Sequence, residues 1–221
     1  MSSVLAFDVY GTLINTHGLV GPLETLGGDS ARQFSQTWRD KQLEYAFRKG
    51  LMQNYQSFAV CTRQALDYTC AFYGAEVSEA EKQELLQSYG SLPAFEDVAQ
   101  GLSNLSAAGH RLFAFSNGSA DAVEGLLQHA GIRRYFEAVV SCDDLKSFKP
   151  NPAVYAHFLR QAKSPASKAW LVSSNPFDVI GSISAGMRAA WVKRSPEAVF
   201  DPWDIQPTVV VGNLQELQSA I

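Results

Sequence analysis

Helical periodicity dominates one internal segment of this chain, between residues 15 and 91, whereas the sequence on either side has a different pattern. Apolar residues recur there at helical spacing in SARQFSQTWRDKQLEYAFRKG, SFAVCTRQALDYTCAFYG and SEAEKQELLQSYG. Ser78 and Glu81 have the spacing of a capping box at the start of the last of these. The segment is therefore expected to form a group of helices with no strand of its own.

Buried strands are predicted before and after this segment. VLAFDV at residues 4–9 is a short apolar run that ends in a polar turn, and strand-like and helix-like runs alternate from Pro93 onward. Strands that alternate with helices form right-handed βαβ crossovers and a parallel sheet. We therefore predict a doubly wound, Rossmann-like α/β core made of residues 1–14 and 92–221, with an inserted helical cap at residues 15–91.

Charge and composition narrow the classes of partner. The formal net charge of −4, without a run of like charges, disfavours nucleic-acid and membrane-surface partners. No apolar stretch approaches the roughly 18 residues of a membrane span, and the first residues lack the basic region of a signal peptide. The three cysteines fit no metal-ligand or CxxC spacing. These features predict a cytoplasmic protein with reduced cysteines.

Polar residues follow four of the predicted strands, at the point where each strand ends. They are Asp8 to Thr12, Ser116-Asn117-Gly118, Lys149-Pro150, and Ser173-Ser174-Asn175 with Asp178. Because the carboxyl ends of parallel strands meet at one edge of a sheet, we expect these groups to converge. Each group taken alone is typical of a turn or a helix cap. Their joint appearance after successive strands favours a catalytic site.

These residues carry a resemblance to a known family. FDVYGTL, SNG, KP and SSNPFD resemble, in order and spacing, the four motifs of the haloacid dehalogenase (HAD) superfamily. YGT after the first aspartate, TWRDKQLEY, and SSN in the fourth motif resemble its (S)-2-haloacid dehalogenase branch, also called L-2-haloacid dehalogenase. The resemblance implies a HAD-like fold and a hydrolase that acts on carbon–halide bonds without a cofactor or metal. It further implies a small 2-haloacid substrate, a halide ion as product, and a homodimer.

The chain departs from the phosphatases of that superfamily where they bind magnesium. Phosphatases have a second aspartate two residues after the first, and this chain has Tyr10 there, which supplies no carboxylic proton near neutral pH. The fourth motif offers Asp178 without a second carboxylate. Few hard oxygen ligands therefore remain for magnesium, and Lys149 becomes the main positive charge expected beside Asp8.

The resemblance assigns roles in a two-step reaction. Asp8 is the nucleophile that displaces the halide and forms an ester. Arg39 accepts the halide, and Asn117 and the edge of Phe177 complete the halide cradle. Ser116 and backbone amides bind the substrate carboxylate. Thr12, Ser173 and Asn175 hold Asp8 and the water of the second step, and Asp178 acts as the base or orients that water. Tyr155 lies near Lys149. An apolar wall lines the site and consists of Tyr10, Leu43, Phe58 and Phe177.

Structural roles compete for several of these residues when the resemblance is set aside. Arg39 then pairs with Asp40 or Glu44 at the surface, Ser116 caps a turn, and Asp178 is a helix N-terminal charge. Two positions also depart from the dehalogenase branch, which favours glutamine and tryptophan where this chain has Asp40 and Phe177. A pair between Asp40 and Arg39 is expected to lower the affinity for halide, and the changed ring alters the size of the pocket.

Three other functions fit parts of the pattern. A magnesium-dependent phosphatase of the same superfamily, acting on a small phosphomonoester, is disfavoured by Tyr10 and SSN. A non-catalytic binding protein is disfavoured because five residues of the motifs occur together: Asp8, Thr12, Ser116, Lys149 and Asp178. A phosphorylatable signalling receiver gives no purpose to the inserted cap.

Overall fold

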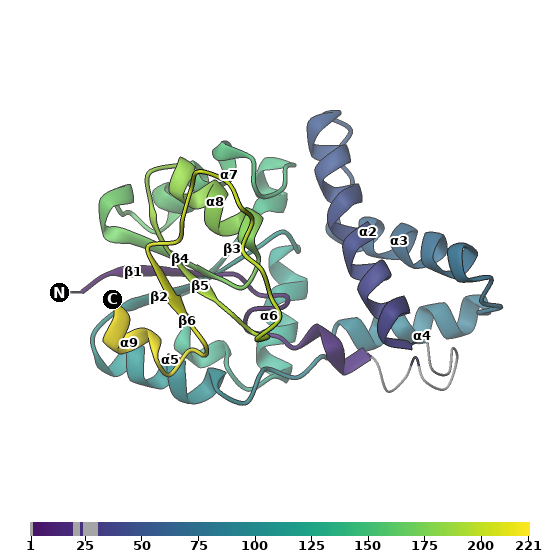
Figure 1. The fold of residues 1–221 in the computed structure, drawn as a ribbon, viewed down its shortest axis with the longest axis horizontal. Coiled ribbons are helices and arrows are strands. Elements are labelled where there is room, and N and C mark those ends of the chain that lie inside the picture. The colour runs from purple at the N-terminus through teal and green to yellow at the C-terminus, as the bar shows by residue number, and fades with distance from the viewer. Residues whose placement is uncertain (1, 20–22, 24–30) are drawn as a thin grey trace.

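The structure of the chain is a computed structural model that describes residues 2–19, 23 and 31–221; residues 20–22 and 24–30 of the predicted cap lie outside the described residues. Its centre is a six-stranded sheet in which every neighbouring pair is parallel, in the order β3-β2-β1-β4-β5-β6 (Figure 1). The strands are β1 (Val4–Phe7), β2 (Arg111–Ser116), β3 (Ala138–Ser141), β4 (Ala169–Ser173), β5 (Arg188–Val192) and β6 (Val209–Val211). The predicted doubly wound parallel sheet is confirmed.

Strand β1 lies in the middle of the sheet because all four of its residues are apolar and buried. Its alternate side chains point to opposite faces. Leu5 and Phe7 belong to the core on one face of the sheet, and Val4 and Ala6 belong to the core on the other face. Apolar residues therefore pack against both faces of the strand that leads to Asp8.

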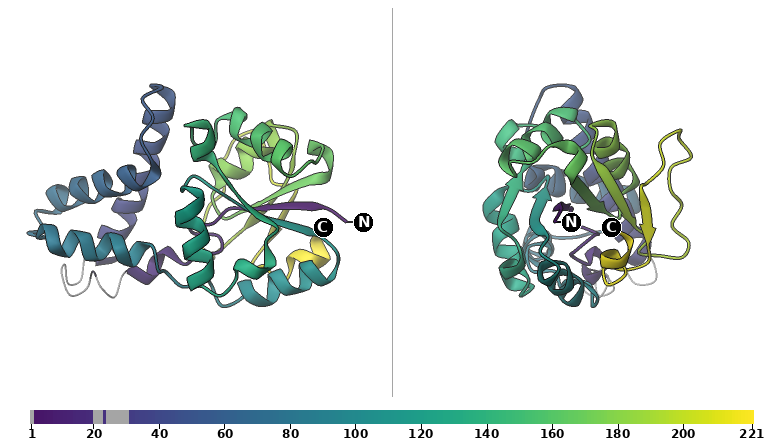
Figure 2. Two further views of the ribbon diagram at one scale, coloured as in Figure 1. Left: turned by 180° about the vertical axis from the view of Figure 1, so that it is seen from behind. Right: turned by 90° about the vertical axis from the view of Figure 1, so that its left-hand side faces the viewer.

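The helices that flank the sheet lie on its two faces, as both views of Figure 2 show. They are α5 (Val98–Ala107), α6 (Ala120–His129), α7 (Pro152–Gln161), α8 (Pro176–Ser184) and α9 (Leu217–Ala220). Short 3-10 helices lie between the main elements: η1 (Thr16–Leu19), η3 (Arg133–Tyr135), η4 (Cys142–Leu145) and η5 (Ala166–Lys168). None of the helices in the described part of the chain has the length and apolar character that a membrane crossing needs.

Three further helices stand to one side of the sheet, at the end where the strands finish (Figure 1). They are α2 (Ala31–Leu51), α3 (Phe58–Tyr73) and α4 (Glu79–Tyr89). The buried ring of Trp38 on α2 donates from Nε1 to the carbonyl oxygen of Thr62 on α3 at 2.8 Å. The predicted capping box of Ser78 and Glu81 opens α4. These helices pack on one another through their own core residues, as the helical periodicity predicts.

The chain leaves the sheet for these helices and returns to it at neighbouring points. The amide of Asn15 donates to the carbonyl oxygen of Pro93 at 2.8 Å, and Ile14 forms an antiparallel bridge with Ala94. The turn between β1 and this crossing is tight, and Gly11 adopts a φ of +84° there, a left-handed conformation that disfavours a side chain. The loop after β1 is thus held at the edge of the sheet.

Candidate active site

The four predicted polar groups converge at the carboxyl edge of the sheet. Asp8 directly follows β1, and its amide donates to the carbonyl oxygen of Val172 in β4 at 3.0 Å. Ser116 and Ser173 end the two strands that pair with β1 on either side. The expectation that these strand ends meet is therefore confirmed by the order of the strands.

The two carboxylate oxygens of Asp8 have different surroundings. Oδ2 accepts hydrogen bonds from Asn175 Nδ2 at 2.7 Å, Thr12 Oγ1 at 2.9 Å and Ser173 Oγ at 3.4 Å. Oδ1 accepts from Lys149 Nζ at 3.1 Å. Because three donors hold Oδ2, the carboxylate is fixed in one orientation, whereas Oδ1 keeps capacity for a further bond.

Lys149 is a buried cation whose three ammonium protons are all used. Its side chain is 1% exposed, and Nζ donates to Asp8 Oδ1, to Asp178 Oδ2 at 2.7 Å and to the carbonyl oxygen of Phe115 at 2.8 Å. Burial opposes the charged form, but the carboxylates of Asp178 and Asp8 outweigh burial and raise the pKa of Lys149. The ammonium therefore stays charged and joins the two carboxylates.

Asp178 lies behind this ammonium and is fully buried in the first turn of α8. Its other oxygen, Oδ1, accepts from the hydroxyl of Tyr155 at 2.7 Å. Burial and the nearby charge of Asp8 raise the pKa of Asp178 to about 6, although Lys149 and the Tyr155 hydrogen bond act in the opposite direction. Tyr155 is itself fully buried, and through this hydrogen bond it contacts Asp178, which binds Lys149.

Arg39 reaches the site from α2. Its Nη1 donates to Gln42 Oε1 at 2.6 Å and its Nη2 donates to the carbonyl oxygen of Tyr10 at 3.3 Å. The expected pair with Asp40 is wrong, because Asp40 instead accepts from Gln36 Nε2 at 2.8 Å.

The alternative partner of Arg39, Glu44, pairs with Lys41 and Arg48. No carboxylate of the described residues pairs with Arg39, so its charge is available to an anion. The expected loss of halide affinity through Asp40 therefore has no structural basis.

A small cavity of about 10 Å³ brings these side chains together, on the order of the space for one water molecule. Its walls combine a carboxylate, two cations, amides and an apolar side: Asp8, Tyr10, Arg39, Leu43, Phe58, Ser116, Asn117, Lys149, Asn175 and Phe177. Every residue predicted for the halide cradle and the apolar wall is in this list. Thr12, Tyr155, Ser173 and Asp178 lie behind it and act on the residues that line it.

Ser116 and Asn117 also serve the local backbone. Ser116 Oγ accepts from the amide of Gly118 at 3.1 Å, so the turn-capping role occurs in the structure, and the hydroxyl proton remains for another acceptor. Asn117 Oδ1 accepts from the amide of Lys149 at 2.9 Å. Because its oxygen is used in this way, the side-chain NH₂ group of Asn117 is the part that can bind an anion in the cavity.

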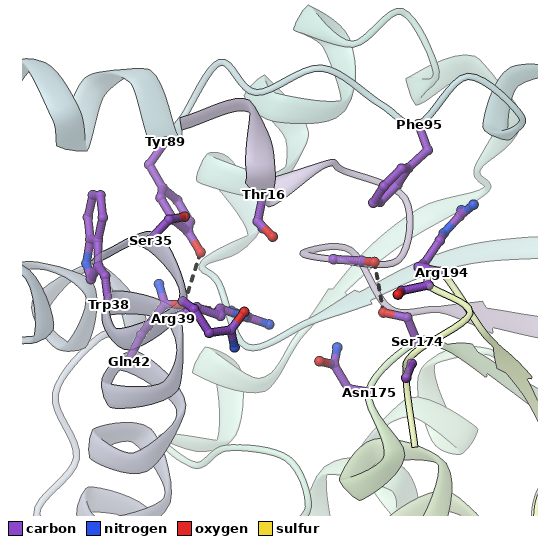
Figure 3. A pocket seen from close by; sticks show the side chains of 14 residues that line it. Thr16, Ser35, Trp38, Arg39, Gln42, Tyr89, Phe95, Ser174, Asn175 and Arg194 are labelled. Carbon is purple, nitrogen blue, oxygen red and sulfur yellow. Dashed lines mark hydrogen bonds between the residues drawn. The ribbon is translucent and has the colours of Figure 1, made fainter. Parts of the chain in front are cut away.

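A larger cleft of about 330 Å³ opens beside the cavity, between α2 and the loop after β4 (Figure 3). Arg39 and Asn175 line both the cleft and the cavity. On its core side, Ser174 Oγ donates to the carbonyl oxygen of Gly11 at 2.8 Å, and Arg194 donates twice to the carbonyl oxygen of Thr12. The cleft is therefore a polar approach to the site, and Arg194 stabilises the loop that carries the nucleophile.

Three residues of this region lay outside the predicted site: Gln42, Ser174 and Arg194. Gln42 had a detectable signal, because a neutral polar side chain three residues after Arg39 lies on the same helical face. Ser174 is part of the SSN motif, and its amide donates to Thr12 Oγ1 at 2.9 Å. Arg194 had no such signal, since it follows β5 at the surface of the predicted core.

The described residues contain no group of three or more His, Cys, Asp or Glu side chains arranged to hold a metal ion. The charges at this site are arranged as carboxylate, ammonium and carboxylate, and the guanidinium of Arg39 lines the same cavity. Such a site can present a carboxylate oxygen as a nucleophile and stabilise an anion that leaves on the opposite side.

Comparison with known proteins gives consistent matches along the chain. A family model described as haloacid dehalogenase-like hydrolase matches residues 3–186. An (S)-2-haloacid dehalogenase of Pseudomonas putida is 33% identical over 215 residues, which cover 97% of this chain and 94% of that protein. Haloacetate dehalogenase H-2 of Moraxella sp. (strain B) is 34% identical over 190 residues, or 86% and 85% of the two chains.

Solved structures match in the same way. The structure of L-2-haloacid dehalogenase from Xanthobacter autotrophicus with chloropropionic acid covalently bound superposes with a TM-score of 0.92. The two proteins are 31% identical, and the match covers 99% of this chain and 98% of that one. The similarity thus spans the sheet and the helices α2–α4 together.

Proposed function

This chain belongs to the haloacid dehalogenase-like hydrolase family, and we propose that it hydrolyses short-chain L-2-haloalkanoic acids and haloacetates to 2-hydroxy acids and halide. The observation that carries the proposal is the asymmetric environment of Asp8. One oxygen is held by three donors, while the other accepts, among the described residues, a hydrogen bond from Lys149 only, and Asp8 lines the same cavity as Arg39. The site therefore has a fixed nucleophile and an anion acceptor in one cavity.

In the first step, Asp8 Oδ1 attacks the carbon that bears the halogen. A bond forms between this oxygen and C2 of the substrate, and the carbon–halogen bond breaks with its electron pair leaving on the halide. Arg39, the NH₂ group of Asn117 and the edge of Phe177 receive the halide. Donors that are placed before the reaction stabilise this developing charge without reorganisation.

The substrate carboxylate is held by groups that leave Asp8 free to react. The Ser116 hydroxyl lines the cavity and retains its proton for an acceptor. Backbone amides of Asn117 and of the turn after Asp8 supply further donors, since loop amides of this kind bind anions. Lys149 offsets the repulsion between the substrate carboxylate and the Asp8 carboxylate.

In the second step, water attacks the carbonyl carbon of the Asp8 ester. Negative charge develops on Oδ2, which Thr12, Ser173 and Asn175 already hold. The bond between this carbonyl carbon and Oδ1 breaks, the product keeps Oδ1 as its hydroxyl oxygen, and a proton is released. The oxygen of the water remains in the carboxylate of Asp8.

Asp178 is proposed to act in this step through Lys149. Both of its oxygens accept hydrogen bonds, from Lys149 and Tyr155. This geometry favours Asp178 as the group that holds the ammonium, and thereby the water, in place. Direct proton abstraction by Asp178 requires it to exchange one of these bonds for the water.

The first experiment measures halide release from L- and D-2-chloropropionate, chloroacetate and fluoroacetate, each with and without EDTA. Release from the L isomer that EDTA does not change is expected, and Asp8→Asn is expected to abolish it while Asp40→Asn retains it. The same substrates indicate which halogens and chain lengths the cavity takes. Absence of release from all four substrates overturns the proposal and directs the test to magnesium-dependent phosphoester hydrolysis.

Isotope labelling tests the ester itself. With enzyme in excess of L-2-chloropropionate in oxygen-18 water, the lactate of a single turnover is expected to be unlabelled and the Asp8 peptide to gain the label. Label in the lactate of that first turnover indicates direct attack by water on C2, which contradicts the ester route.

The proposal includes the division into a core of residues 1–14 and 92–221 and a cap of residues 15–91, a cytoplasmic location, and a homodimer. Exposed apolar side chains on the helices of the cap support pairing, among them Leu51 of α2, which is 86% exposed, and Val60 of α3, which is 37% exposed. Light scattering of the purified protein tests the dimer, with a monomer mass as the contrary result.

A further inference from the structure

A second large cleft, of about 480 Å³, also borders the reaction cavity and shares no wall residue with the polar cleft. Its walls are apolar for the most part, and they include Phe47 of α2, Phe148, Phe177 and Trp203. The proposed reaction uses only Phe177 among these. The function of this cleft is therefore not explained by the chemistry of halide displacement.

The apolar cleft adjoins the reaction cavity. Lys149 and Phe177 line both spaces. On α2, Leu43 lines the cavity, and Ala46 and Phe47, one turn further along the helix, line the cleft. Phe58 of the cavity and Phe148 of the cleft pack with ring centroids 6.3 Å apart. Apolar side chains thus extend without interruption from the reacting centre into the cleft.

The Phe177 ring forms the partition between the two spaces. Phe47 packs against it edge-on, with the ring centroids 5.0 Å apart and an angle of 73° between the ring planes. Because Phe177 lines both spaces and Phe47 lines only the cleft, Phe47 supports the partition from the cleft side. A smaller side chain at position 47 removes that support.

The substituents of the substrate carbon indicate what enters this cleft. The carboxylate and the halogen are anionic or become so, and they bind the polar side of the cavity at Ser116, Asn117 and Arg39. The remaining alkyl group is apolar. Burial of an alkyl chain is more favourable in the apolar cleft than in the polar cleft, where guanidinium and amide groups would lose water.

We propose that the apolar cleft is an alkyl subsite that binds the tail of L-2-haloalkanoic acids longer than propionate. This inference rests on the proposed function, and it extends the substrate class from two- and three-carbon acids to longer chains. Each buried methylene is worth up to about fourfold in kcat/KM at the usual strength of the hydrophobic effect. Phe47 and Gly50 then determine the chain length that the enzyme accepts.

Gly50 allows the cleft to be filled without strain. It lies in helix α2, and a side chain there would first meet Phe148 at 3.6 Å, which is ordinary contact. Gly50→Leu therefore occupies the cleft and leaves the reaction cavity untouched. Phe47→Ala removes the ring that supports Phe177 and widens the boundary between the cleft and the reaction cavity. Phe72→Ala, a phenylalanine deletion on the exposed side of α3, is the matched control.

The test compares kcat/KM for L-2-bromopropionate, L-2-bromobutanoate and L-2-bromohexanoate in these variants. Gly50→Leu is expected to lower the value for hexanoate about tenfold relative to propionate, mainly through KM. Phe47→Ala is expected to raise the same ratio, and Phe72→Ala to leave it unchanged. Equal effects of Gly50→Leu on all three substrates overturn the alkyl subsite.

Three further outcomes are informative. In the first, the enzyme turns over L-2-bromopropionate, but neither Gly50→Leu nor Phe47→Ala changes the ratio of kcat/KM for bromohexanoate to kcat/KM for bromopropionate. That result rejects the subsite and leaves the proposed function intact. A change of oligomeric state in Gly50→Leu without a change in the ratio also rejects the subsite, since it shows that a second copy covers the cleft. Failure to release halide even from bromopropionate rejects the proposed function itself.

Discussion

The guanidinium of Arg39 is held by Gln42, whose Oε1 accepts a hydrogen bond from Nη1 at 2.6 Å. Gln42 is fully buried, and its Oε1 also accepts from the hydroxyl of Tyr89 on α4 at 3.0 Å. Its Nε2 donates to Thr62 Oγ1 on α3 at 2.6 Å. Three helices therefore fix the position of the amide that orients the proposed halide acceptor.

Removal of this amide is expected to slow the displacement step selectively. Gln42→Leu deprives a charged donor of its acceptor, an interaction worth about 1.5–3 kcal/mol, so the rate of Asp8 ester formation is expected to fall about 10- to 100-fold. The rate of ester hydrolysis is expected to stay the same, because the halide has already left. Rapid-quench mass spectrometry of the Asp8 peptide measures both steps.

Gln36→Leu is the control for this prediction, since Gln36 lies on the same helix and binds Asp40. Tyr89→Phe removes one neighbouring bond to the Gln42 oxygen and is expected to have a smaller effect than Gln42→Leu. Equal loss in both chemical steps indicates a general folding defect and contradicts a positioning role for Gln42.

The buried ammonium is expected to be required for stability as well as for activity. Lys149→Met leaves Asp8 and Asp178 without their shared cation, and loss of one partner from a buried ion pair costs about 3–5 kcal/mol. Urea unfolding at pH 7 is expected to show a loss of this order, together with no detectable halide release. Lys146→Met, which removes an exposed ion pair with Asp143, is expected to change stability by less than about 1 kcal/mol.

The pH dependence of kcat/KM is expected to report the Asp178 carboxyl. Its pKa is raised to about 6, so the ionised form that holds Lys149 is lost as the pH falls through about 6, and activity decreases on that side. The Tyr155 hydrogen bond stabilises the ionised form. Tyr155→Phe therefore raises the pKa of Asp178 and moves the acidic limb of the profile to higher pH. Movement to lower pH, or none, contradicts this assignment.

A glycine in α8 tests the same contact from the backbone. A side-chain carbon at Gly181 would lie 2.5 Å from the Tyr155 hydroxyl oxygen and 2.8 Å from Pro150 Cβ. Gly181→Ala is expected to displace Tyr155, to lower stability by about 1–3 kcal/mol, and to move the acidic limb in the same direction as Tyr155→Phe. Gly125→Ala in α6 meets no atom within 4 Å and is expected to be neutral or slightly stabilising.

The fold followed closely from the sequence because its signals are local. Runs such as VLAF and AWLV are continuous apolar segments, which buried parallel strands require. Helical spacing and the Ser78–Glu81 capping box predicted the helices α2–α4 with their approximate ends. The meeting of Asp8, Ser116 and Ser173 was also predictable, since any parallel sheet brings its strand ends to one edge.

The details of the charges were not predictable in this way. Asp40 adjoins Arg39 in the sequence and yet binds Gln36, because successive residues of a helix point in different directions. The partner of Arg39 depends on where α3 and α4 place Thr62 and Tyr89 around Gln42. Likewise, Asp178 lies behind Lys149 because the ammonium reaches across from the loop after β3, a placement that no local pattern encodes.

The sequence by itself determined the order of strands and helices, the edge of the sheet that carries the polar residues, and the choice of Asp8 as the proposed nucleophile, since local periodicity and motif order suffice for these. Only the tertiary structure decided which donors hold each oxygen of Asp8, which side chain orients Arg39, and how the two clefts border the reaction cavity. Hydrogen-bond partners and cavity walls come from residues far apart in the chain, so they exist only after the helices and strands have packed together.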